Sequence, residues 1–100
     1  MRHDLSKTLE QMGSSAEEVA ATLRATGVQG ARNTVRGLNP IVRYVQNTLR
    51  LDNFDADVMT GVTFRVRGID GVEVPLPKAV VDFVDGFNRG AYPDLELPGG

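Results

Sequence analysis

One run of residues restricts the fold of this chain more than any other: positions 62–76 alternate between apolar and polar side chains and lead directly into an amphipathic segment that begins at Pro77. Successive side chains of a β-strand point to opposite faces, so the even-numbered apolar residues on both halves of the run share one face. An Asp70-Gly71 pair separates the two halves and favours a turn. We therefore predict a β-hairpin with strands at about 62–67 and 72–76, followed by a helix over about 77–89.

The phase of the alternation also predicts a register for the hairpin. Because the apolar residues are even-numbered on both strands, opposed residues have numbers with an even sum, which favours a three-residue loop over a two-residue Asp-Gly loop. The predicted pairs are Val66–Val74, Phe64–Leu76 and Arg67–Glu73, with Ile69–Gly71 as the loop. Pro75 has no backbone N–H, so the second strand is predicted to lie at an edge of the sheet.

Three helices are predicted before the hairpin, each from a start signal, an apolar stripe and a stop. They run from Asp4 to Gly13, from the capping box of Ser15 and Glu18 to Gly27, and from Asn39-Pro40 to about Leu51. A lone hairpin is marginal in water, so we expect the helices to cover it or a third strand to form at Val58-Met59 or Glu96-Leu97. Because the element order contains no βαβ unit, the predicted fold class is α+β.

Length and composition indicate one small domain. The chain has 100 residues, of which 41% are hydrophobic and 24% charged, as in ordinary soluble proteins. Residues 1–14 are considered as a mobile N-terminal helix, and residues 91–100 as an extended C-terminal tail. With no cysteine there is no disulfide framework, and residues 1–20 hold neither a signal peptide nor a spanning segment, so we expect a cytoplasmic protein without membrane contact.

The charges are distributed unevenly along the chain. Residues 1–50 carry seven Lys or Arg and four Asp or Glu, whereas residues 51–100 carry four and nine, so the halves have net charges of +3 and −5. Two interpretations follow: the halves neutralise each other by packing together, or a basic face binds an anionic partner.

No arrangement of residues in the sequence indicates catalysis. His3 is the only histidine and has no neighbour to tune it, and the serines have no positioned base. The segment 52–57 holds Asp52, Asp55 and Asp57 but lacks the glycine and glutamate of a calcium-binding loop, so we read it as an acidic linker in which Phe54 anchors to the core. We predict no catalytic residue, no cofactor and no metal.

Two groups of residues are candidates for binding a partner. Four arginines, Arg32, Arg36, Arg43 and Arg50, occupy a basic loop and the following helix, where the last two are seven residues apart and share a face. The second group is the tail with Tyr92, Leu95 and Leu97, which either folds back onto its own domain or docks on another chain.

These observations predict a small non-catalytic module for protein–protein interaction: an adaptor, a regulatory subunit or a homo-oligomer. The alternative is a nucleic-acid accessory protein that uses the arginine face, whose binding would fall steeply with salt. Gly99-Gly100 is also the chemical handle of ubiquitin-like modifiers, but three helices ahead of the hairpin do not fit the order of elements in those proteins.

Overall fold

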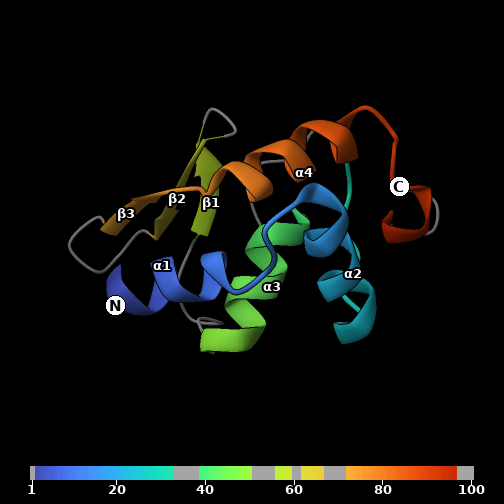
Figure 1. The fold of residues 1–100 in the computed structure, drawn as a ribbon. Helices are drawn as coiled ribbons and strands as arrows, with labels where there is room; N and C mark the ends of the chain where they lie inside the picture. Colours follow the sequence, from blue (N-terminus) through green and yellow to red (C-terminus); the bar gives the residue numbers. More distant parts are fainter. Residues whose placement is uncertain (1, 33–38, 51–55, 60–61, 67–71, 97–100) are drawn as a thin grey trace.

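The computed structural model describes residues 2–32, 39–50, 56–59, 62–66 and 72–96, and it confirms the predicted α+β class (Figure 1). Its elements are α1 (Arg2–Glu10), α2 (Ala16–Thr26), α3 (Pro40–Leu49), β1 (Ala56–Met59), β2 (Thr63–Val66), β3 (Val72–Pro75), α4 (Lys78–Asn88) and the short 3-10 helix η1 (Pro93–Leu95). The three N-terminal helices, the hairpin and the C-terminal helix are thus all present.

The hairpin belongs to an antiparallel sheet with strand order β1-β2-β3. Its predicted register is wrong by two residues, because Phe64 lies opposite Val74 rather than Leu76, and Arg65 rather than Arg67 lies opposite Glu73. A shift of two residues keeps every side chain on its predicted face, so the alternation alone could not distinguish these registers. The strands leave residues 67–71 between them, and the predicted loop Ile69–Gly71 lies outside the described residues.

The third strand corrects the reading of residues 52–57 as a linker. Ala56 and Asp57 belong to β1, together with the Val58-Met59 pair that was one of the two predicted sources of a third strand. Asp57 lies opposite Arg65 in this pairing. The proposed anchor, Phe54, lies outside the described part of the chain.

The strand β3 forms one edge of the sheet, as we predicted from the position of Pro75. Leu76 donates its backbone N–H to the Val62 carbonyl at 2.8 Å, and in an antiparallel pair the backbone groups of alternate residues point toward the neighbouring strand. Pro75 therefore lies at a position facing away from β2, where it has no N–H to offer. This arrangement blunts the exposed edge against pairing with another strand.

Local capping signals place the helices as predicted, with one exception. The Ser15 hydroxyl accepts a hydrogen bond from the Glu18 backbone N–H at 3.2 Å, and the Asn39 side chain accepts from Ile41 N–H at 2.9 Å. The exception is α1, which begins at Arg2, so that Asp4 lies in its first turn and is not the N-cap.

One hydrophobic cluster joins all layers of the fold. Helix α1 contacts α3 and β3, α3 contacts β1, and α2 packs along α4 (Figure 1). The predicted apolar face of the last helix is buried, as are the apolar positions of α1; these residues are Val80, Phe83, Val84 and Phe87, and Leu5, Leu9 and Met12. Val62, predicted to face the core, is instead 48% exposed.

The C-terminal segment does not form the extended tail that was predicted. Residues Pro93–Leu95 form η1, and Glu96 makes a parallel bridge with Gly30. The segment thus folds back onto its own domain beside the end of α2, which was one of the two alternatives. Residues 97–100, including Leu97 and the terminal glycines, lie outside the described residues.

Candidate functional site

Two candidate regions from the sequence, the arginine loop and the C-terminal tail, meet in one place. Arg32 pairs with Glu96, and Leu95 is buried against the end of α2. We call this arrangement the C-terminal clasp: residues 92–96, and the receiving surface formed by Leu23, Arg24, Val28, Gln29, Gly30 and Arg32. Arg43 and Arg50 lie on and after α3 instead, and Arg36 lies outside the described residues.

The receiving surface begins where α2 ends. Gly27 adopts the left-handed conformation (φ 71°), and the Val28 N–H then donates to the Leu23 carbonyl at 3.0 Å, which closes the end of α2. This turn buries Val28 and directs the chain alongside η1. The glycine at position 27 is therefore what places Gln29 and Gly30 beside the C-terminal segment.

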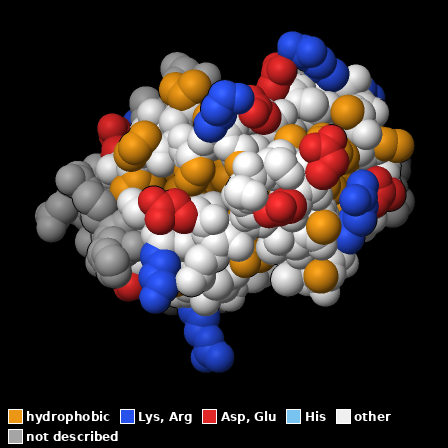
Figure 2. Space-filling view, in the orientation of Figure 1, with side chains coloured by type: hydrophobic (Ala, Val, Ile, Leu, Met, Phe, Trp, Pro, Cys, Tyr) orange, Lys and Arg blue, Asp and Glu red, His pale blue; other side chains and the backbone are white. Residues whose placement is uncertain are grey.

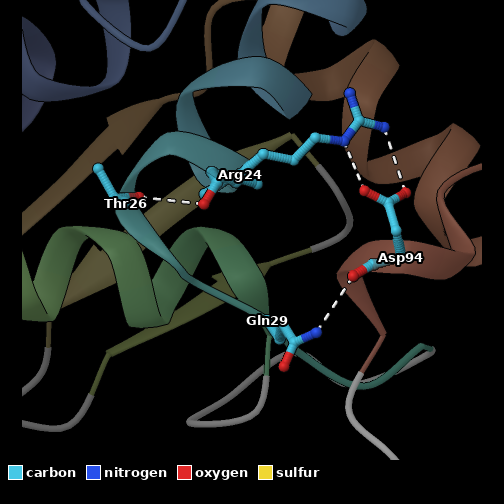
Figure 3. A network of polar contacts seen from close by, with 5 residues as sticks. Arg24, Thr26, Gln29 and Asp94 are labelled. Atoms are coloured by element: carbon cyan, nitrogen blue, oxygen red, sulfur yellow. Dashed lines mark hydrogen bonds and ion pairs between the residues drawn. The ribbon is translucent and has the colours of Figure 1, made fainter.

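Two hydrogen bonds from the receiving surface bind the backbone of the segment. The Gly30 N–H donates to the Leu95 carbonyl at 2.9 Å. The Gln29 side-chain amide donates to the Asp94 carbonyl at 3.1 Å (Figure 3). Because both acceptors are main-chain carbonyls, these contacts would hold a chain segment of any sequence.

A small apolar seat lies between these contacts. Leu95 is 2% exposed and belongs to the same buried cluster as Leu23 and Val28, and an unfilled hollow of about 340 Å³ borders this seat. The centre of the segment is thus held by the burial of one leucine.

Each carboxylate beside Leu95 meets an arginine. Arg24 donates from Nε and Nη2 to the two oxygens of Asp94, at 2.5 and 3.2 Å (Figure 3), and Arg32 Nε lies 2.9 Å from the Glu96 carboxylate. The hydrogen bond from Arg24 lowers the pKa of Asp94, and the same bond raises the pKa of Arg24. The side chains of Arg24 and Asp94 remain 48% and 52% exposed, so water screens their attraction.

Tyr92 anchors the segment to α4. Its ring lies 4.9 Å from the ring of Phe83, and burial raises the pKa of its hydroxyl. A Cβ atom added at Gly86 would lie 3.1 Å from Tyr92 Cε2. A glycine inside a helix is unfavourable by about 1 kcal/mol relative to alanine, and the close approach of Tyr92 accounts for its presence here.

The contributions that hold the segment nearly cancel. Burying one leucine contributes about 1.5–3 kcal/mol, and two hydrogen bonds to carbonyls contribute about 1 kcal/mol each. Fixing the backbone of the four residues 93–96 costs about 1–2 kcal/mol per residue, or about 4–8 kcal/mol. The exposed ion pairs add little, so the favourable and unfavourable contributions to docking of residues 93–96 are of similar size.

The arginines of α3 form a separate surface. Arg43 is partly exposed and Arg50 is exposed, and Arg50 holds the left-handed conformation (φ 56°) that ends the helix. Acidic and basic side chains are interspersed over the face drawn in Figure 2, without a large area of one sign. The three arginines of this group that the structure describes are thus divided between two places in the fold.

Known proteins give no guide to this site. No protein-family model matches the chain, and neither a curated protein nor a solved structure matches it. Within the described ranges, no group of three His, Cys, Asp or Glu residues is placed to hold a metal ion, and no helix has the length and apolar character to cross a membrane.

Sequence reasoning missed four residues whose side chains make polar contacts in the clasp: Arg24, Gln29, Asp94 and Glu96. Arg24 and Asp94 are 70 positions apart, so no spacing rule connects them. The available signal was the opposite net charge of the two halves, because the two ion pairs of the clasp each join the basic half to the acidic half.

Proposed function

We propose that this protein acts by binding other proteins, without catalysis, and that the receiving surface of the C-terminal clasp is its binding site. The observation that carries the proposal is that the surface already binds a short chain segment in cis. It combines main-chain hydrogen bonds, an apolar seat and charged contacts, which is how peptide-binding domains recognise extended or turned segments.

The alternative function, nucleic-acid binding by the arginine face, has less support. Arg32 is engaged by Glu96 within the clasp. Arg43 and Arg50 would have to supply the phosphate contacts with Arg36, on a chain whose net charge is −2. A basic surface this small favours a protein partner.

The proposal is tested by offering the segment in trans. The probe is a peptide with the sequence of residues 91–96, Ala-Tyr-Pro-Asp-Leu-Glu, added to the full chain carrying Leu95→Asp, which removes its own leucine from the seat. Binding is followed by NMR at the Gly30 backbone amide and the Gln29 side-chain amide. We expect saturable shifts with a dissociation constant of about 0.1–1 mM. This value is the effective concentration of the segment in cis, about 1 mM, divided by the ratio of docked to detached segment, about 1–10.

A peptide of the same composition in scrambled order is the control and should leave both amides unchanged. Circular dichroism tests whether Leu95→Asp remains folded. If this variant is unfolded, Asp94→Lys replaces it as the variant with a weakened clasp. Absence of shifts at millimolar peptide in a folded variant would overturn the proposal. Binding of short DNA or RNA at low salt, with no response to the peptide, would support the alternative instead.

A further inference from the structure

We infer that the partner of this site is a protein segment with a leucine between two carboxylates, and that residues 92–96 of the protein compete with it for the receiving surface. The inference rests on the proposed function and names the chemistry of its partner and its regulation.

The acidic character follows from the positions of the two arginines. Arg24 and Arg32 meet carboxylates at positions 94 and 96, one on each side of the leucine in the seat. The contacts from Gly30 and Gln29 reach only carbonyls and cannot select a sequence. Selection must therefore come from the leucine seat and the two cations, which together specify the order acidic, leucine, acidic.

The pairing of Arg24 also has the geometry of carboxylate recognition. Its Nε and Nη2 each reach a different oxygen of Asp94, which is a two-point contact that a single carbonyl or hydroxyl cannot make. Because about half of each side chain is exposed, Arg24 is accessible to a carboxylate of another protein once Asp94 has left it.

The competition follows from the way the segment is attached. Tyr92 packs on Phe83 and over Gly86, outside the apolar seat, and so holds the segment close to its site. An incoming peptide must displace residues 93–96, and its apparent affinity falls by the fraction of molecules in which the site is occupied in cis. Removing the Tyr92 anchor should open the site without changing any residue that binds the partner.

The experiment measures fluorescence anisotropy of two labelled peptides, Pro-Asp-Leu-Glu and Pro-Lys-Leu-Glu, against full-length variants. We expect Tyr92→Ala to bind Pro-Asp-Leu-Glu up to about tenfold more tightly than the unaltered chain does, because the cis competitor is weakened. Arg24→Glu should bind Pro-Asp-Leu-Glu at least about fivefold more weakly and should gain affinity for Pro-Lys-Leu-Glu. Lys78→Glu, a charge reversal at an 88% exposed side chain of α4, is the matched control and should change neither affinity.

Each negative result would contradict a different part of the proposal. Equal affinity of the unaltered chain and Tyr92→Ala for Pro-Asp-Leu-Glu would overturn the competition. If Arg24→Glu binds each peptide as tightly as the unaltered chain does, the acidic specificity is overturned. In both cases the proposed function stands. If neither peptide binds to any variant, including the folded Leu95→Asp chain, the proposed function fails as well.

Discussion

The structure contains two arginine–aspartate pairs with the same two-point geometry in different surroundings. In the sheet, Arg65 donates to both oxygens of Asp57 at 3.2 and 2.8 Å, and the side chains are 25% and 6% exposed. In the clasp, Arg24 and Asp94 are about half exposed. In both pairs the hydrogen bond that the arginine donates to the aspartate raises the pKa of the arginine.

The two pairs differ in how readily water can replace the hydrogen bonds between arginine and aspartate. The Asp57 carboxylate is shielded from solvent, so hydrogen bonds lost from Arg65 are not readily regained from water. Asp94 can be hydrated at once when the segment leaves. Arg65 also lies between two acidic neighbours on adjacent strands, Asp57 and Glu73, whereas Arg24 meets a segment near the chain end. The first pair belongs to the fold, and the second is suited to exchange.

The largest expected contrast is between the apolar centres of the two regions. Phe64 is fully buried on the central strand, and Phe64→Ala should lower the free energy of unfolding by about 3–5 kcal/mol. Leu95→Ala should lower it by only about 1 kcal/mol, because the segment detaches before the rest of the domain unfolds and the loss cannot exceed its docking free energy. Urea denaturation followed by circular dichroism measures both.

Similar losses for the two variants would show that the clasp unfolds together with the core, and that the segment cannot exchange independently. Leu95→Met, which nearly conserves the buried volume, is the control for Leu95→Ala and should remain close to the unaltered chain.

The two arginines provide the next contrast. Arg65→Met should lower the melting temperature by several degrees, because the buried Asp57 loses two hydrogen bonds. Arg24→Met should leave the melting temperature nearly unchanged and instead accelerate hydrogen exchange at the Gly30 amide, which reports local opening of the clasp. A large drop in melting temperature with Arg24→Met would contradict the assignment of this pair to an exchangeable contact.

The two regions also differ in how far the sequence predicts them. Helix ends depend on neighbours within a few residues, so Ser15, Gly27 and Asn39 were sufficient to place α2 and the start of α3. The alternation of apolar and polar residues in the hairpin predicted which side chains share a face. The alternation did not predict the register, because two registers that differ by two residues place the same side chains on each face.

The clasp lies beyond such local rules. Arg24 reads as an ordinary exposed helix residue, and Asp94 as part of a polar tail, until the fold brings them together. Leu95 was predicted as a partner-binding residue, yet it is 2% exposed in the structure and occupies the seat itself. The sequence showed which residues were unusual for a solvent-exposed tail, but it could not show that their first partner is their own chain.

A smaller effect is expected at the anchor of the segment. Gly86→Ala gains helix propensity of about 1 kcal/mol but places a methyl group 3.1 Å from Tyr92 Cε2, so the two contributions should largely cancel. In the Tyr92→Ala background the contact is gone, and Gly86→Ala should stabilise the chain by about 1 kcal/mol. Urea denaturation of the four variants tests this cycle. The same gain in both backgrounds would show that Tyr92 does not account for the glycine.

The smallest effect is expected from acid. The hydrogen bond from Arg24 lowers the pKa of Asp94 below its ordinary value of 3.8, so a detached segment binds a proton more readily than a docked one. The pair therefore favours docking fully above pH 3.8, and this contribution is lost as the pH falls through the lowered pKa of the docked state. NMR of the Gly30 amide between pH 6 and 2.5 should show the clasp opening at the acid end, while the core signals of β2 persist over more of the range. Asp94→Asn should lack the part of this transition that depends on Asp94, and an unchanged transition in that variant would assign the acid response to another carboxylate.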